Sequence, residues 1–220
     1  MNYHQTRLEH DQRREVLWKT LCESFFQRLV PPDAAVLDLG CGYGDFINHI
    51  RCGSKFAMDR WDGAAGHVRP DVKLLTGSIA ELAGIPDASI DFVFASNVFE
   101  HLTQAEFGSC LERVKRVLRP AGTLNIVQPN YRFCYDEYFD DYTHVAVYSD
   151  RSLCDFLRAS GLEILECRPR FLPLTIRSRL PVWPPLIRAY LVSPLKPLAK
   201  QMLVRAAVDR SAQNGDFAPK

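Results

Sequence analysis

Three glycines stand at alternate positions in this chain, at Gly40, Gly42 and Gly44, and they follow a short apolar run that holds one acid, Asp38. Glycine permits backbone conformations that other residues avoid, and it lets a ligand approach the bare backbone. A nearly all-apolar run suits a strand buried on both faces of a parallel sheet, and ligands bind at the carboxyl ends of such strands. Residues 36–46 therefore predict a strand, a glycine turn and the start of a helix around a ligand site.

A second acid, Asp59, ends the next apolar run and lies 19 residues after Gly40. A carboxylate at the end of the second strand can accept hydrogen bonds from the hydroxyl groups of a ribose. Arg60 follows directly and is expected beside the base of a bound nucleoside. An acid in this place can also cap a helix or lie in a solvated turn, and the spacing alone leaves that alternative open.

Polar residues reappear in the sequence SNVFEHL, which follows a strand predicted at residues 90–95. Asn97 stands at the carboxyl end of that strand, where ligands bind in open α/β sheets. His101 belongs to the same motif and is a candidate general base, with a purely structural role as its alternative. A second histidine, His144, lies in a long aromatic and acidic loop after residue 130, and loops of that length in compact domains are often functional.

The sequence DLGCGYG resembles motif I of the class I S-adenosylmethionine (SAM) dependent methyltransferases, and SNVFEHL is similar to motif IV of their small-molecule and glycan enzymes. The glycine spacing is GxGxG, whereas a nicotinamide-binding turn has GxGxxG. The resemblance covers about residues 34–167 and implies SAM as the cofactor, with Asp38 near its cationic end and Asp59 on its ribose. Related enzymes often have an acid where this chain has Ser78, so the backbone of Ile79 is expected to meet the adenine. The implied cofactor-binding residues are Asp38, Gly40, Cys41, Gly42, Gly44, Asp59, Arg60, Ser78, Ile79 and Asn97.

The same resemblance directs attention to the acceptor side of the site. Methyl transfer from SAM is an in-line displacement with a good leaving group, so positioning supplies much of the rate. A hydroxyl acceptor also benefits from a general base. His144 is the first candidate, because its loop follows the fifth strand beside the expected methyl end, and His101 is the second. The acids of this loop have no spacing that strongly supports a metal site, so none is predicted.

These residues require a sheet to bring them together. We expect an α/β fold with a Rossmann-like, seven-stranded methyltransferase sheet, mostly parallel with the last strand antiparallel, and helices on both faces. One domain is expected over residues 1–210. Its parts are an N-terminal helix at 5–29, a core at 34–167, an insertion at 168–200 and a last strand at about 202–208. Residues 211–220 are predicted to be a disordered tail.

The insertion at 168–200 has an unusual composition. It holds seven prolines, five arginines and two lysines, and no acid occurs between Cys167 and Val208. The proline density argues against one long helix. Three interpretations stay open: an irregular cap over the substrate, a surface that touches anionic membrane or a lipid-linked substrate, and a nucleic-acid surface, which is the least favoured.

Length and composition limit the domain count, the compartment and the kind of protein. The chain of 220 residues is long enough for one domain with a full core. Its net charge of +1 points to no particular partner, and no run approaches 18 apolar residues, so no membrane-spanning helix is predicted. Seven scattered cysteines without CxxC pairs indicate reduced thiols. The N-terminus has no apolar signal core, and a cytoplasmic protein is expected, with contact at the inner membrane surface under the second interpretation of the insertion.

The favoured function is transfer of a methyl group from SAM to a small-molecule, glycan or lipid-linked acceptor, at an oxygen atom. Two alternatives stay open. The first is a module that binds SAM without catalysis, and the second, less favoured, is a nicotinamide-dependent oxidoreductase. Nucleic acid is an unlikely partner, and no sequence feature indicates an oligomeric state.

Overall fold

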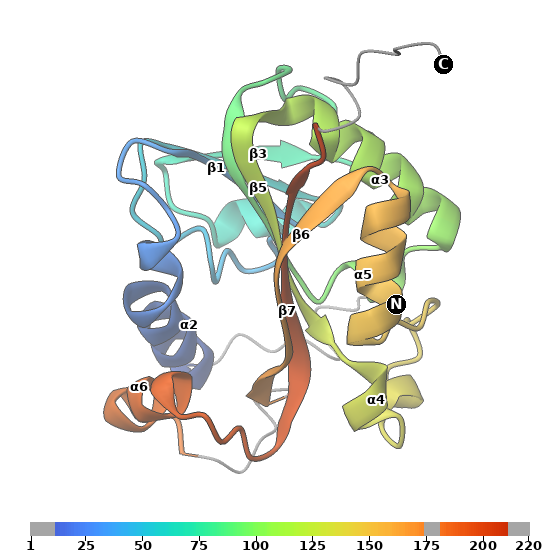
Figure 1. Cartoon of the computed structure of the whole chain (residues 1–220). Helices are drawn as coiled ribbons and strands as arrows, with labels where there is room; N and C mark the ends of the chain where they lie inside the picture. The colour runs from blue at the N-terminus through green and yellow to red at the C-terminus, as the bar shows by residue number, and fades with distance from the viewer. Residues whose placement is uncertain (1–11, 174–180, 211–220) are drawn as a thin grey trace.

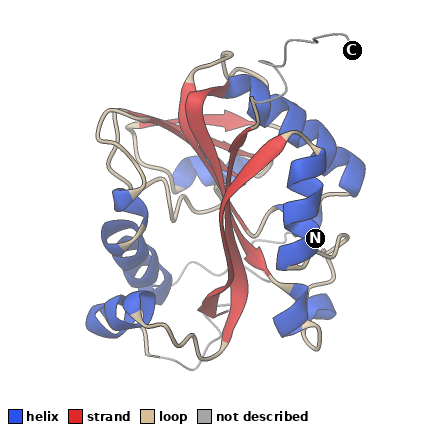
Figure 2. Cartoon of the chain, in the orientation of Figure 1, coloured by secondary structure: helices blue, strands red, loops and turns tan. Residues whose placement is uncertain are grey.

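A seven-stranded sheet forms the centre of the computed structural model, which describes residues 12–173 and 181–210 (Figures 1 and 2). The strand order is β3-β2-β1-β4-β5-β7-β6. Six of these strands run in one direction, and β7 runs in the opposite direction between β5 and β6. The predicted fold class is therefore confirmed. The strands are β1 (Ala35–Leu39), β2 (Ser54–Asp59), β3 (Val72–Thr76), β4 (Ile90–Ser96), β5 (Leu118–Pro129), β6 (Leu162–Pro173) and β7 (Ala199–Val208).

Helices cover both faces of the sheet (Figure 1). On one face, α2 (Gln12–Ser24) packs beside α6 (Pro184–Val192), and on the other lie α3 (Gln104–Val117) and α5 (Asp150–Ala159). Each pair buries its own apolar cluster against the sheet, the first around Phe26 and Phe94 and the second around Phe107. A short helix, α4 (Tyr131–Cys134), follows β5. Turns of 3-10 helix complete the chain at η1 (Phe26–Arg28), η2 (Asp62–Gly66), η3 (Phe99–His101) and η4 (Tyr138–Asp140).

The two longer helices on the second face begin where the sequence places their caps. Thr103 accepts a hydrogen bond from the Glu106 backbone N–H, and the Glu106 carboxylate accepts one from the Thr103 backbone N–H, which makes a capping box. Ser149 and Ser152 form the equivalent box at the start of α5. Helix α3 thus begins directly after the SNVFEHL motif, which lies at the carboxyl end of the central strand β4.

The N-terminal helix ends earlier than predicted. The sequence predicts a helix over residues 5–29, whereas α2 ends at Ser24 and the 3-10 turn η1 follows; residues 5–11 lie outside the described residues. The chain turns here because Phe26 is fully buried and packs edge-on against Phe46 and Phe94, with ring centroids 5.6 and 5.1 Å apart. A straight helix would carry this ring away from the core.

The predicted helix after the glycine turn does not form, and residues 42–49 are a series of turns. Only isolated helical hydrogen bonds are present, such as Asn48 N–H to the Gly44 carbonyl at 2.9 Å. The segment then leaves the helical path, because the Arg51 N–H donates to the side chain of Gln27 at 2.9 Å. Asp45, at the start of the predicted helix, pairs with Arg14 of α2.

The predicted insertion at 168–200 is partly sheet. Strand β6 continues to Pro173 and β7 begins at Ala199, and the two strands pair across this region with several shifts of register. Burial explains the extension, since Phe171 and Leu172 pack into the cluster of the first face. Helix α6 starts with two prolines at its first positions, where their missing N–H groups cost no helical hydrogen bond. Residues 174–180 and the predicted tail at 211–220 lie outside the described residues.

Candidate cofactor and acceptor site

The strand order reverses between β1 and β4, and the two turns that follow these strands meet at that point. Gly40 has φ +66°, and a Cβ atom on it would lie 2.6 Å from Cγ2 of Val98 in the turn after β4. Contacts that short do not occur, so only glycine allows the turns to approach so closely. Gly42 and Gly44 also have positive φ, at +51° and +70°. The bare backbone of the glycine turn therefore lies at the switch point of the sheet, where folds of this type have their ligand-binding crevice.

Asp59, the predicted ribose partner, lies against the glycine turn. One carboxylate oxygen accepts a hydrogen bond from the Gly42 N–H at 2.7 Å, and the other accepts one from the Trp61 N–H at 2.9 Å. The acid is thus held in place by backbone groups while each oxygen keeps a second lone pair. A diol of a bound nucleoside could donate to those lone pairs.

Asp38 lies beneath the glycine turn and is 3% exposed. Its pKa is raised well above the ordinary value, first by burial and then by the neighbouring carboxylates of Asp45 and Asp59, although a backbone hydrogen bond from Ile47 acts the other way. Three acids so close together favour a cation nearby. Arg14 supplies one to Asp45, and a cationic ligand in the crevice would supply another.

Asn97 stands at the carboxyl end of β4 with φ +54°, a conformation that asparagine tolerates better than most residues. Its N–H donates to the Val127 carbonyl at 2.8 Å, and its side-chain oxygen accepts from Gln201 of β7 at 2.7 Å. These bonds hold the turn after β4 against the neighbouring strands. The amide of Gln128 on β5 is also buried and has no hydrogen-bond partner at either side-chain atom.

The remaining predicted cofactor residues differ in burial, from the buried Cys41 and Ile79 to the exposed Arg60. Cys41 is 6% exposed, and burial followed by nearby Asp38 raises the pKa of its thiol far above the usual range, which agrees with a packed residue rather than a nucleophile. The Ile79 side chain is buried in the core, and the Ser78 hydroxyl accepts from the Ala80 N–H at 3.3 Å. Arg60 is mostly exposed and lies 3.8 Å from Glu106 of α3.

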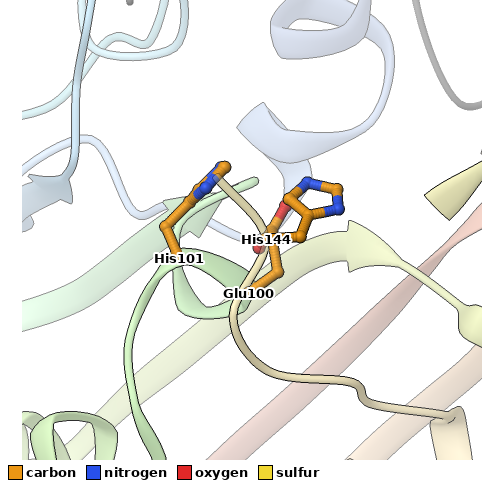
Figure 3. A group of neighbouring side chains, drawn as sticks. All are labelled: Glu100, His101 and His144. Carbon is orange, nitrogen blue, oxygen red and sulfur yellow. The ribbon is translucent and has the colours of Figure 1, made fainter. Parts of the chain in front are cut away.

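His101 and His144 come together although 42 residues separate them, with ring centroids 4.9 Å apart (Figure 3). The backbone explains the approach: the N–H groups of Val145 and Ala146 both donate to the Glu100 carbonyl, at 2.9 and 3.2 Å. The loop after β5 is thereby fastened to η3, directly behind the end of β4. The predicted pair of acceptor-side histidines thus forms one cluster.

Hydrogen bonds fix the orientation of both rings. Nδ1 of His144 lies 2.6 Å from the Tyr138 carbonyl oxygen, so it carries the proton and donates. Nδ1 of His101 lies 3.2 Å from the Thr143 carbonyl and 3.0 Å from the Thr143 hydroxyl, which itself donates to Asp141 at 2.6 Å. When the rings are neutral, each therefore has its lone pair on Nε2. Burial, and then the neighbouring His144, lower the pKa of His101, which keeps it neutral near pH 7.

Glu100 is the member of the cluster that sequence reasoning missed. The side chain is fully buried between the two histidines' backbone segments, and neither carboxylate oxygen has a hydrogen-bond partner. Burial raises the pKa of this carboxyl group to about 8. The only signal in the sequence is an acid inside an otherwise apolar motif, VFEHL, where a surface charge is not expected.

Comparisons with known proteins match this chain to methyltransferases, by sequence and by structure. Residues 37–126 match the family model described as a methyltransferase domain. A probable SAM-dependent methyltransferase of Mycobacterium tuberculosis strain H37Rv is 38% identical over 124 residues, which cover 53% of this chain and 44% of that protein. The chain thus matches less than half the length of this curated relative.

Solved structures with low sequence identity share the fold. A SAM-dependent methyltransferase from Archaeoglobus fulgidus superposes with a TM-score of 0.67 at 19% identity, over 93% of this chain and 96% of that one. A putative methyltransferase solved in complex with the Haloferax volcanii Trm112 methyltransferase activator superposes with a TM-score of 0.66 at 18% identity, over 90% and 92% of the two chains.

Within the described residues, no helix is both long and apolar enough to span a membrane.

Proposed function

Because the chain carries the sequence signature and the sheet of the class I SAM-dependent methyltransferases, we propose that it transfers the methyl group of SAM to an oxygen atom of a small-molecule, glycan or lipid-linked acceptor. The observation that carries the proposal is the pairing of Asp59 with the Gly42 backbone beside the β1–β4 crevice. This arrangement offers a ribose partner and a bare backbone at the one place where the fold binds ligands.

The cofactor's parts find complementary groups in this crevice. We assign the ribose to Asp59 and the glycine turn, and the cationic end to the acidic group around Asp38. The turn with Ser78 and Ile79 follows β3, the neighbour of β2, and we assign the adenine to it. Trp61 adds a ring surface on the same side, since it stacks on His67 and meets Tyr43 edge-on. Asn97 is assigned to the amino-acid end, at the close of β4.

On the acceptor side we assign His144 and His101 to the accepting atom. As the acceptor oxygen forms its bond to the methyl carbon, the carbon–sulfur bond breaks and its electron pair returns to sulfur, which becomes neutral. The hydroxyl proton passes to the Nε2 lone pair of a neutral imidazole, whose Nδ1 is held as a donor. General-base assistance of this kind contributes about 10²–10⁴ to a rate.

The region of residues 168–200 supports a further part of the proposal, contact with a membrane surface or a lipid-linked acceptor. Several large apolar side chains here are exposed, among them Trp183, Val192 and Leu195. Others, such as Phe171 and Ile187, pack into the core, so part of this region is structural. Exposed apolar groups among basic residues suit an interface with anionic lipid.

A direct assay tests the proposal. Purified protein should bind SAM in calorimetry and should transfer radiolabelled methyl groups to a member of a panel of glycan, lipid and small-molecule hydroxyl acceptors. Binding of SAM without transfer to any acceptor would favour the non-catalytic module. Thermal stabilisation by NAD but not by SAM would favour the oxidoreductase and contradict the proposal.

A further inference from the structure

We propose that Glu100, His101 and His144 form a binding site for one divalent transition-metal ion, which holds an oxygen of the acceptor (Figure 3). The metal site itself stands on the geometry of these side chains. The role toward the acceptor deepens the proposed function and rests on it.

The three side chains gather from two segments, η3 and the loop before α5. Each offers one ligating atom, and these atoms all lie within 4.8 Å of one another. A cation can lie within about 2.8 Å of three atoms at that spacing, and nitrogen and oxygen bonds to zinc are about 2.0–2.2 Å, so each ligand atom must move by less than about 1 Å. Side-chain rotation supplies a movement of that size.

The carboxylate of Glu100 is the observation that points to a ligand. A buried carboxylate normally has several hydrogen-bond donors, because an unpaired one costs several kcal/mol. Both oxygens of Glu100 are buried and neither has a partner. The cations of the neighbouring segments lie elsewhere: Lys200 pairs with Glu137 and Arg132 with Asp150. A bound cation would satisfy this group where the described protein atoms do not.

The hydrogen bonds behind the two histidines are those of prepared metal ligands. In metal sites, the histidine nitrogen that does not bind the metal usually donates to a carbonyl, a carboxylate or water, which fixes the tautomer and the direction of the ring. Here Nδ1 of His144 donates to the Tyr138 carbonyl and Nδ1 of His101 to Thr143, which is linked in turn to Asp141. A neutral ring held in this way carries its lone pair on Nε2, the nitrogen that would bind the ion.

The ligand types indicate the kind of ion. Two imidazoles and one carboxylate suit zinc, manganese(II), iron(II) or cobalt(II), whereas magnesium and calcium prefer sites made mostly of oxygen. Three protein ligands leave positions on the ion open for other ligands. The cluster lies beside the end of β4, next to the turn of Asn97, to which we assign the amino-acid end of the cofactor. The sulfonium that carries the methyl group is bonded to that end, so an acceptor oxygen is the expected ligand at an open position of the ion.

With an ion bound, the two imidazoles act as metal ligands and no longer as general bases. A metal-bound hydroxyl loses its proton more readily, because the ion stabilises the resulting oxygen anion. The proton then passes to solvent water, and the oxygen attacks the methyl carbon as in the proposed transfer. Acceptors with an ionisable hydroxyl would be favoured over amines, which are poorer partners once protonated.

Cobalt(II) tests the site without any assay of activity. Protein freed of metal with a chelator should bind one equivalent of Co²⁺ and develop the visible absorption bands of a nitrogen- and oxygen-ligated ion. The variants Glu100→Gln and His144→Ala should each weaken Co²⁺ binding by more than about 10-fold, since each removes a direct ligand, and even changes behind the ligands cost about 10–100-fold. Asp136→Asn, an exposed acid of the same loop, is the matched control and should bind Co²⁺ as the unaltered protein does.

SAM affinity is measured on the same samples to separate the outcomes. Co²⁺ binding that is absent, or equally strong in Glu100→Gln and His144→Ala, overturns the metal site even if SAM binds normally. A protein that binds Co²⁺ through these residues but does not bind SAM supports the metal site and contradicts the proposed function instead. Normal SAM affinity in Glu100→Gln and His144→Ala shows that the variants are folded, and Glu100→Asp should restore part of the Co²⁺ binding.

Discussion

At the scale of single residues, Asp59 connects the glycine turn to the proposed ribose site. Its carboxylate accepts from Gly42 and from Trp61, so it positions the turn as well as the ligand. Few residues of the site combine these two tasks. A substitution here should therefore affect the cofactor far more than the overall fold, because Asp59 is only partly buried at the end of β2.

We expect Asp59→Ala to weaken SAM binding by about 1–3 kcal/mol, or about 5- to 150-fold, because two ribose hydroxyls lose their acceptor. Titration calorimetry measures this change. Asp33→Ala, an exposed acid before β1, is the control and should leave affinity unchanged. Equal affinity in folded Asp59→Ala and in the unaltered protein would remove Asp59 from the cofactor site.

Both forms of the proposed mechanism assign His144 to the acceptor, as a base or through a bound ion. We expect His144→Ala to lower turnover by about 10²–10⁴ while SAM affinity stays within twofold. Radiolabelled methyl transfer with an identified acceptor measures turnover, and calorimetry measures affinity. His67→Ala, on the cofactor side near Trp61, should show the opposite balance. Turnover close to normal in His144→Ala would contradict the assignment.

At the scale of elements, the loop after β5 is held by a small polar network. The side-chain N–H of Asn130 donates to Asp150 at 2.8 Å and to the Pro169 carbonyl at 3.0 Å, and Arg132 donates to Asp150 at 2.9 Å. Asn130 is fully buried. The network joins the end of β5, the start of α5 and β6, and so fixes both ends of the loop that carries His144.

Removing the acid from this network should destabilise the protein. We expect Asp150→Ala to lower the free energy of unfolding by about 1–3 kcal/mol, because a buried donor of Asn130 loses a partner. Asp155→Ala on the same helix should change it by less than about 0.5 kcal/mol, since Asp155 forms an exposed ion pair with Arg158. Chemical denaturation of the three proteins measures the difference, and equal losses in both variants would show that the network adds no stability.

The pH dependence of this effect has a definite direction. Burial acts to raise the pKa of Asp150, but the hydrogen bonds from Asn130 and Arg132 outweigh it and hold the pKa below the ordinary value. The stabilisation is therefore present above the unfolded pKa, near 3.9, and is lost as the pH falls through the lower folded pKa. Unfolding curves for Asp150→Ala and the unaltered protein should converge only in that acidic range.

Strands and capped helices were predictable from the sequence, because their signals are local. The apolar run at residues 90–95 predicts β4 to within one residue, and Thr103 and Ser149 are residue types that cap helix starts. The Glu100 site was not predictable, since it forms only when the loop at 143–146 folds back onto η3. The lost helix after Gly44 likewise depends on distant partners, Arg14 and Gln27. Contacts between remote segments decided these features.

At the scale of the whole molecule, several of the basic side chains of residues 168–200 form ion pairs with acids outside this region. Arg168 pairs with Glu166 at 2.5 Å, Arg188 lies 3.8 Å from Glu23, and Lys200 pairs with Glu137. The acids absent from this region are supplied by the segments around it. Arg177 and Arg179, whose charge reversal is the direct test of electrostatic docking, lie outside the described residues.

The exposed apolar side chains are therefore the stronger argument for membrane contact. Trp183, Val192 and Leu195 are 61%, 77% and 76% exposed, and they belong to α6 and its flanks. Each basic residue near an anionic surface contributes about 1 kcal/mol, and buried apolar groups add to this. Together they allow reversible docking that salt weakens, since the Debye length is about 10 Å at 0.1 M and about 3 Å at 1 M.

We expect the protein to co-sediment with anionic vesicles at low salt, and less so with neutral ones. The double variant Trp183→Ser with Leu195→Ser should reduce the bound fraction at least about threefold, because it removes the groups that enter the lipid. Leu165→Ser, an exposed apolar residue of β6 outside this region, is the matched control. Charge reversal by Arg177→Glu with Arg179→Glu should reduce binding chiefly at low salt. If the unaltered protein does not bind anionic vesicles and both double variants keep full activity, the membrane interpretation is wrong. Residues 168–200 then form a cap for a water-soluble acceptor, held to the core by the buried side chains of Phe171, Ile187 and Leu191.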